Sequence, residues 1–164
     1  MKKTLFGFIA ASLLMITSCQ KPEPLYSGAW SFKNVTYPNL STVIDTAVAF
    51  RTIETDNSST SNLSTYGTLT VQFYGTFPPQ AGTYLVDGSA YTHQSDHVFV
   101  TATTGGGTQA TDYQSTGTGS SPRVVVSISN NHISLSGTGI ELVNGLNPND
   151  TGAVNLNFAS VLIY

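Results

Sequence analysis

Cys19 is the only cysteine in the 164-residue chain, and its surroundings indicate what its sulfur is for. Lys2 and Lys3 stand at the start, an apolar run from Leu5 to Ile16 follows, and small residues lead into the cysteine. A secretory signal has this same order, in which positively charged residues are followed by an apolar stretch and then by small residues. A thiolate is a nucleophile, and an unpaired thiol is a liability in an exported protein. The pattern therefore predicts export followed by covalent modification of Cys19.

The segment Ile16-Thr17-Ser18-Cys19 resembles the lipobox of bacterial lipoproteins, in which an aliphatic and two small residues precede an obligatory cysteine. The resemblance implies a diacylglyceryl group on the Cys19 sulfur, cleavage before Cys19 and a further acyl chain on the freed amine. Two or three such chains hold a protein firmly at a bilayer. We therefore expect a lipoprotein signal peptide over 1–18, a lipidated cysteine and tether over 19–27, and a single β domain over 28–164. An ordinary signal peptide with an incidental cysteine is the alternative.

The residues after Cys19 bear on the destination of the protein. Gln20, rather than an aspartate, follows the cysteine, which in lipoprotein sorting rules resembles an outer-membrane cargo. The run Cys19-Gln20-Lys21 followed by Glu23 also resembles the surface-export tether of lipoproteins from the Bacteroidota. We expect a lipid anchor in the outer membrane, with the domain either on the periplasmic face or on the cell surface.

Other groups of residues suggest metal chemistry, although none of them has the full pattern of a metal site. His93, Asp96 and His97 offer two imidazoles and a carboxylate, but in a turn entering a strand the two histidines lie about 13 Å apart. Asn147-Pro148-Asn149-Asp150 lacks the alternating acids and central glycine of a calcium loop. We expect exposed turn residues in both places, and neither a metal nor a cofactor.

The sequence contains none of the common catalytic motifs considered and one candidate modification motif. There is no Gly-x-Ser-x-Gly elbow, and Gly105-Gly106-Gly107 has no nearby lysine to complete a phosphate loop. We therefore expect a protein without enzymatic activity, with dispersed carboxylates leaving an envelope hydrolase as one alternative. Asp45-Thr46-Ala47 resembles the short O-glycosylation acceptor of the Bacteroidota, which makes Thr46 a candidate site, although a position within a strand favours packing instead.

The composition limits the class of protein that must carry these residues. Charged residues make up only 9% of the chain, and removal of 1–18 leaves four basic residues against nine acidic ones, a net charge of −5. Nucleic-acid binding needs clustered lysines and arginines, so we expect no nucleic-acid partner. Thr and Ser together number 42, and β-branched hydroxyl residues suit the solvent face of a strand.

Apolar and polar residues alternate with a period of two along most of the mature chain, which is typical of β-strands. We expect strands near 29–37, 43–54, 68–73, 83–86, 96–103, 122–129, 132–138, 141–143 and 153–164, with a turn at Asn130-Asn131 and looser segments over 56–64 and 104–121. Short strands joined by Gly, Pro and Asn turns predict an all-β fold. The specific expectation is an antiparallel β-sandwich or a small closed barrel of about eight strands.

Two further resemblances concern the body of the protein. Leu69 to Phe73, Ala81 to Tyr84, Val124 to Ile128 and His132 to Gly137 carry a likeness to small β-rich lipoproteins of the Bacteroidota, which implies fold and location but no activity. Gly28-Ala29-Trp30 and Thr111-Asp112-Tyr113 resemble two short motifs of the lipocalins. That resemblance implies a barrel in which Trp30 packs against an arginine, for which Arg123 is available.

The sequence thus predicts a lipid-anchored module of the cell envelope with a binding or structural role, whose partner is a protein or a glycan. A lipocalin-like carrier of a small apolar ligand is the first alternative, and a hydrolase is the second. A binding module is expected to expose an aromatic or apolar patch. The candidates for that patch are Tyr66, Tyr74, Tyr91 and Tyr113.

Overall fold

A computed structural model describes residues 26–45, 51–56, 66–75, 78–88, 94–106, 109–117 and 122–161. This part of the chain is all-β, as the alternating sequence predicts, and no helix in it is long and apolar enough to cross a membrane. It contains eleven strands, where about eight were expected. They are β1 Tyr26–Phe32, β2 Val35–Pro38, β3 Ser41–Asp45, β4 Arg51–Asp56, β5 Tyr66–Phe73, β6 Gly82–Asp87, β7 His97–Gly106, β8 Gln109–Ser115, β9 Arg123–Ser129, β10 His132–Asn144 and β11 Thr151–Val161.

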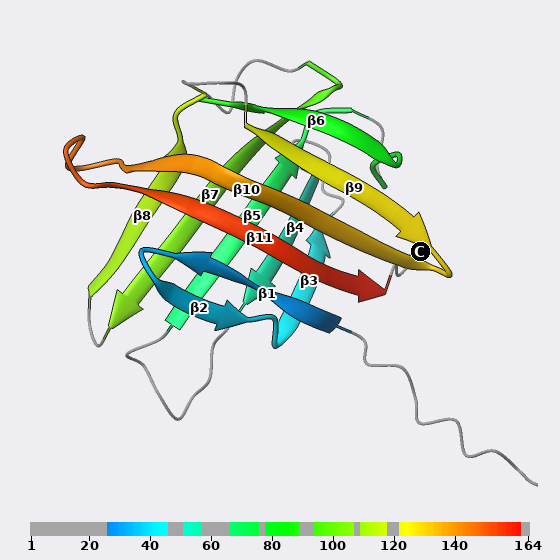
Figure 1. Cartoon of the computed structure of the whole chain (residues 1–164), viewed down its shortest axis with the longest axis horizontal. Coiled ribbons are helices and arrows are strands. Elements are labelled where there is room, and N and C mark those ends of the chain that lie inside the picture. Colours follow the sequence, from blue (N-terminus) through cyan, green and yellow to red (C-terminus); the bar gives the residue numbers. More distant parts are fainter. Residues whose placement is uncertain are drawn as a thin grey trace, which may run out of the picture.

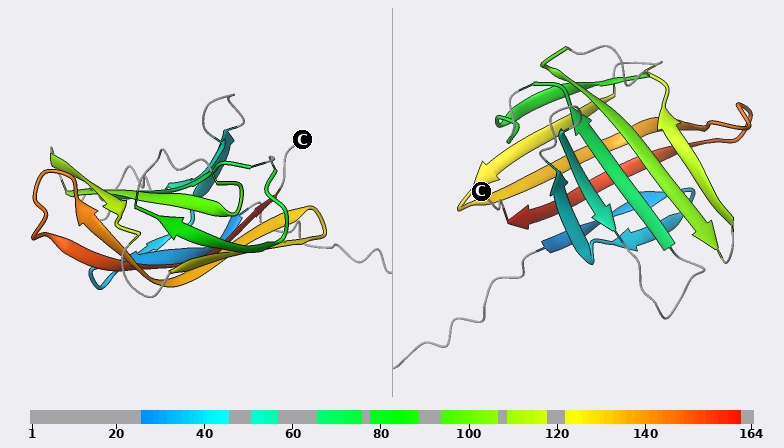
Figure 2. Two further views of the ribbon diagram at one scale, coloured as in Figure 1. Left: turned by 90° about the horizontal axis from the view of Figure 1, so that it is seen from above. Right: turned by 180° about the vertical axis from the view of Figure 1, so that it is seen from behind.

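The strands form one continuous sheet that folds over into two layers (Figures 1 and 2). The order is β2-β1-β11-β10-β9-β6-β7-β5-β4-β3, and β8 also pairs with both β10 and β7. Hydrogen bonds thereby run in a ring through β6, β7, β8, β10 and β9, although the whole is not a regular barrel. β6 and β7 pair in parallel, and the other strand pairs of the described part are antiparallel. The fold therefore combines the layers of a sandwich with closure along one side.

The core lies between the two layers and follows the period-two pattern. Leu69, Val71 and Phe73 of β5 face inward from one layer, and Val154, Leu156 and Phe158 of β11 face inward from the other. All six side chains are at most 2% exposed. Because alternate residues of a strand point to opposite faces, the polar residues between them face outward. The alternation predicted from sequence is thus confirmed in both layers.

Two segments expected to be single strands are hairpins. The expected strand 29–37 turns back at Lys33 and Asn34, which have φ angles of 49° and 65°, so that β1 and β2 pair with each other. Within the expected strand 43–54, β3 pairs antiparallel with β4, and Ile44 lies opposite Ile53. The chain reversal inside each segment adds one strand to the number that the sequence predicts.

The region after residue 96 differs from the expectation in a second way. β7 extends to Gly106 and β8 covers Gln109–Ser115, so much of the segment expected to be loose is paired strand. The expected strands 132–138 and 141–143 are one strand, β10, interrupted by a bulge between Gly137 and Ile140. The predicted turn at Asn130-Asn131 is confirmed, with φ angles of 49° and 62° between β9 and β10. β1 begins at Tyr26, so the last two residues of the expected tether belong to a strand.

Candidate functional site

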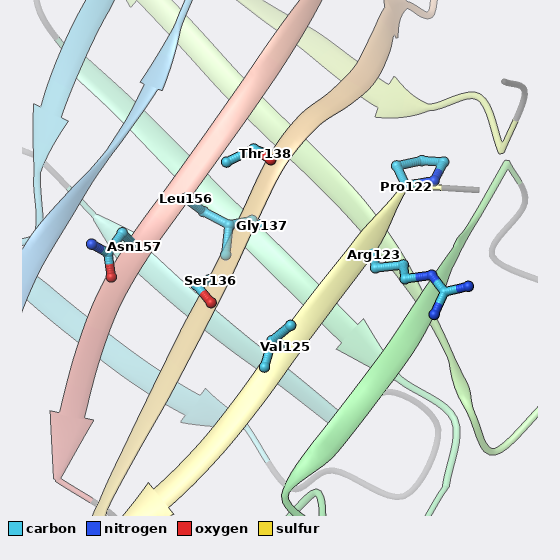
Figure 3. Close-up of a pocket in the computed structure, with 8 residues that line it drawn as sticks. All are labelled: Pro122, Arg123, Val125, Ser136, Gly137, Thr138, Leu156 and Asn157. Atoms are coloured by element: carbon cyan, nitrogen blue, oxygen red, sulfur yellow. The ribbon is translucent and has the colours of Figure 1, made fainter. Parts of the chain in front are cut away.

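The outer face of the sheet is hollowed where β9 and β10 separate. The two strands pair as far as Val125 and Ser136. On its other edge β9 pairs with β6 over residues 123–126, and farther along its length β10 pairs with β8 over residues 142–144. The space at this fork is an open hollow of about 550 Å³ (Figure 3). We call it the fork hollow; its lining residues are Pro122, Arg123, Val125, Ser136, Gly137, Thr138, Leu156 and Asn157. Its volume falls in the range of ligand sites in proteins.

Two glycines in β10 shape the backbone where its pairing with β9 ends. A Cβ atom at Gly137 would lie 2.8 Å from the Arg123 carbonyl oxygen and 3.1 Å from Ile140 Cδ1, so a side chain there would push β9 and β10 apart. Gly139 has a φ of 66°, a conformation that favours glycine, and its N–H donates to Asn155 Oδ1 at 2.9 Å. These contacts fix the bulge, and the bulge turns β10 away from β9.

Three side chains of the fork hollow come from three neighbouring strands and share the outer face. Register places Val125 opposite Ser136, and Ser136 opposite Asn157, in a single row across the sheet. Figure 3 shows these three side chains on the outer face, with the Arg123 guanidinium reaching over β6. At about 4.8 Å between neighbouring strands, the row from β9 to β11 spans about 10 Å. The hollow therefore presents an amide, a hydroxyl and an apolar side chain side by side.

The polar side chains of the fork hollow are not used to hold the fold together. Within the described part of the chain, those of Arg123, Ser136, Thr138 and Asn157 form no hydrogen bond or ion pair. Asn155, two residues before Asn157 on the same face, is by contrast bonded to Gly139 and to Ser31. A positive charge and three hydrogen-bonding groups are thus available to a ligand.

A second polar cluster joins the parallel strands β6 and β7. His97 Nδ1 lies 2.7 Å from Asp87 Oδ1, and His97 Nε2 lies 3.7 Å from Asp96 Oδ1. The His97 side chain is only 15% exposed, so the expectation of an exposed turn residue is wrong: His97 is the first residue of β7. Burial, together with the charge of Asp87, raises the pKa of Tyr74 to about 12. His93 lies outside the described residues, so the expected separation of about 13 Å between His93 and His97 stays a prediction.

A third cluster lies where the turn between β1 and β2 and the turn between β10 and β11 meet β8. Lys33, at the turn between β1 and β2, is bonded to Tyr113 OH at 3.0 Å and to the Asp150 carboxylate. Tyr113 OH donates to Asp150 Oδ2 at 2.9 Å, and Asn144 Nδ2 donates to the same oxygen at 3.0 Å. The Lys33 ammonium also lies 4.4 Å from the centre of the Tyr113 ring. The cluster therefore connects these two turns to β8.

The pKa of the Asp150 carboxyl is expected to lie well below that of an ordinary aspartate. Hydrogen bonds from Asn144, Lys33 and Tyr113 lower its pKa from 3.8 to about 2. A lowered folded-state pKa stabilises the fold above pH 3.8, and this contribution is lost as the pH falls from there through about 2. An NMR pH titration of the Asp150 carboxyl carbon measures the value. Asn144→Ala should raise it, and Asn149→Ala, whose side chain makes no bond to Asp150, should not; an unshifted Asp150 in the wild type would contradict the arrangement.

The aromatic residues expected to form an exposed patch do not form one in the described structure. Tyr113 is only 6% exposed and packs edge-on against Phe32, with ring centres 4.7 Å apart. Tyr66 and Tyr74 are half-buried, and Tyr91 lies outside the described residues. Among the described residues, the large apolar side chains that are exposed are aliphatic ones: Val35, Leu40, Val43, Val125, Ile128 and Leu146.

The tryptophan and the arginine of the lipocalin resemblance lie on different sides of the sheet. Trp30 is 1% exposed and stacks on Tyr37, with ring centres 4.0 Å apart. Arg123 lies on the outer face of β9, so the contact that the resemblance implies is not formed. Thr111-Asp112-Tyr113 belongs to β8 rather than to a loop. Cys19 and Thr46 lie outside the described residues, and their modification remains a prediction.

Sequence reasoning considered Arg123 only as a partner for Trp30, and it missed Ser136, Thr138 and Asn157. Asn157 lies between two buried residues and Ser136 follows the buried Leu135, which is the pattern of any solvent-facing strand residue, and Thr138 lies between two glycines. The one signal in this region is Gly137-Thr138-Gly139, because glycines inside a strand indicate a bulge.

Comparison with known proteins assigns the chain to no family. No protein-family model matches the chain, and neither the curated proteins nor the solved structures give a match.

Proposed function

We propose that this protein is a lipid-anchored module of the cell envelope that binds a partner, without enzymatic activity, through the fork hollow. The observation that carries the binding role is the convergence of four polar side chains from three strands on one open hollow, none of them paired within the described part of the chain. They gather where glycines and a bulge have opened the strand pairing.

The anchoring part of the proposal rests on Cys19 and on the short chain between it and the fold. β1 begins seven residues after Cys19, at Tyr26. A fully extended chain of that length reaches at most about 25 Å. A lipidated Cys19 therefore keeps the β domain beside the outer membrane, on the periplasmic face or on the cell surface.

Lipidation is tested by feeding cells an alkyne-tagged fatty acid and detecting the label on the purified protein. We expect label on the wild type, complete loss of label in Cys19→Ala, and retention in Thr17→Ser, which keeps a small residue in the lipobox. Intact-mass spectrometry of the mature protein provides a second measurement, because each acyl chain adds its own mass. Label that survives Cys19→Ala, or a wild-type protein with a bare thiol, would overturn the anchor.

A further inference from the structure

We infer that the fork hollow binds a saccharide that carries a carboxylate, with Arg123 taking the carboxylate and the row of Ser136 and Asn157 taking the hydroxyl groups. The inference rests on the proposed binding function and names the chemical class of its ligand. Three features of the hollow support it, namely its charge, its hydrogen-bonding groups and its shape.

The charge of the hollow comes from Arg123. A guanidinium binds a carboxylate through two parallel hydrogen bonds, and it keeps its charge at any physiological pH. Arg123 has no ion-pair partner in the described part of the chain, although the mature chain carries more than twice as many acidic as basic residues. A single arginine, with no second cation among the lining residues, matches one negative charge better than the two of a phosphate monoester.

The hydrogen-bonding groups match a sugar rather than a hydrocarbon. The Ser136 and Thr138 hydroxyls and the Asn157 amide each donate and accept, as sugar hydroxyls do. Val125 is 41% exposed in the same row and, with Pro122 at the rim, offers apolar contact to the C–H groups of a sugar ring. A ligand with alternating hydroxyl and C–H surfaces satisfies both kinds of side chain.

The shape of the hollow suits a chain that lies across the strands. The polar row runs from Asn157 on β11 to Val125 on β9, and the Arg123 side chain continues in the same direction over β6 (Figure 3). The hollow is open to solvent along this line, so an oligosaccharide can cross it without threading into the core. The carboxylate then lies at the β6 side, and the hydroxyls lie over β10 and β11.

The test compares two ligands with the same sugar chain, one with charged carboxylates and one with those carboxylates neutralised as methyl esters. The probes are a tetramer of galacturonic acid and the same tetramer with every carboxylate methyl-esterified, titrated by calorimetry into the full-length protein in detergent micelles. We expect the wild type to bind the acid at least about tenfold more tightly than the ester, because an Arg–carboxylate pair is a charge-assisted bidentate contact. Arg123→Gln should remove this preference, and Asn157→Ala should weaken the binding of both tetramers severalfold.

Ser127→Ala is the matched control, because Ser127 lies on the outer face of β9 just beyond the row and does not line the hollow. This variant should bind both tetramers as the wild type does. The substitutions at Arg123, Ser127 and Asn157 should leave the thermal midpoint of unfolding unchanged, because all three side chains are exposed. Equal binding of acid and ester would overturn the inference that Arg123 binds a carboxylate, and the hollow would then be a site for neutral glycans. Binding of neither tetramer, in protein that carries its lipid, would overturn the inference and leave the anchor of the proposed function standing.

Discussion

Replacing Gly28 with alanine is expected to destabilise the domain by about 3–5 kcal/mol, as backbone strain adds to overpacking. Gly28 lies in β1 with a φ of 86°, where a side chain is strained whatever the space around it. A Cβ atom there would also lie 2.1 Å from the Asn157 carbonyl oxygen and 2.7 Å from Phe158 Cα. Both contacts are backbone atoms of β11, which cannot rotate away as a side chain can. β1 and β11 must therefore separate, or the backbone at Gly28 must leave its positive φ.

Urea unfolding of the full-length protein, followed by tryptophan fluorescence, measures this effect because Trp30 is buried two residues from Gly28. Gly82→Ala is the matched control: Gly82 has no positive φ, and a Cβ atom there would have no heavy atom within 4 Å. We expect that variant to change stability by less than about 1 kcal/mol. Equal unfolding midpoints for the two variants would mean that β1 and β11 are not packed as closely as described.

The same contact explains why glycine precedes alanine and tryptophan at the start of the domain. Gly28-Ala29-Trp30 resembles a lipocalin motif in sequence, yet here the glycine is required by the approach of β11, and Trp30 is held by Tyr37 and by Gly67. A Cβ atom at Gly67 would lie 2.8 Å from Trp30 Cζ2. A short motif of this kind therefore follows from local packing, and packing alone does not identify a family.

The period-two alternation allowed the fold class and most of the paired segments to be predicted, but it hid the turn at Lys33 and Asn34. Lys33 and Asn34 reverse the chain within a segment that looks uniformly strand-like. The buried positions do carry a signal, because they change from the even-numbered Trp30 and Phe32 to the odd-numbered Tyr37. A single regular strand cannot make that change without a bulge, so the parity of its buried residues is informative.

The fork hollow was beyond prediction for a different reason. Arg123, Ser136 and Asn157 are neighbours only through the register of β9, β10 and β11, and register is a property of the folded sheet. β8 was missed because its inward-facing residues are Tyr113 and the polar Ser115, which is fully buried and accepts a hydrogen bond from the Val100 N–H. A strand with a buried serine gives a weak apolar pattern.

Replacing Asn39 with leucine is expected to cost about 3–5 kcal/mol of stability, because each buried polar group left without a partner costs about 1–3 kcal/mol. Asn39 lies at the corner where the chain passes from β2 to β3 and so from one layer to the other. Its amide nitrogen donates to the carbonyl oxygens of Ser27 and Ala159, at 3.3 and 3.2 Å. Its amide oxygen accepts from the Thr42 and Thr55 hydroxyls, both at 3.0 Å. One side chain, 7% exposed, thereby joins the two layers.

Asn39→Asp separates the donor half of this side chain from the acceptor half. The carboxylate keeps both threonine bonds but faces the Ser27 and Ala159 carbonyls, so the folded state should raise the pKa of the new carboxyl above its ordinary value. A raised folded-state pKa means that stability is retained below the unfolded-state pKa and is lost as the pH rises through the folded one. We therefore expect urea midpoints of Asn39→Asp close to the wild type at pH 3.5 and far below it at pH 7. Asn149→Asp, at an exposed turn without such bonds, should follow the wild type at both pH values; an Asn39→Asp protein that does the same would show that Asn39 does not hold the layers together.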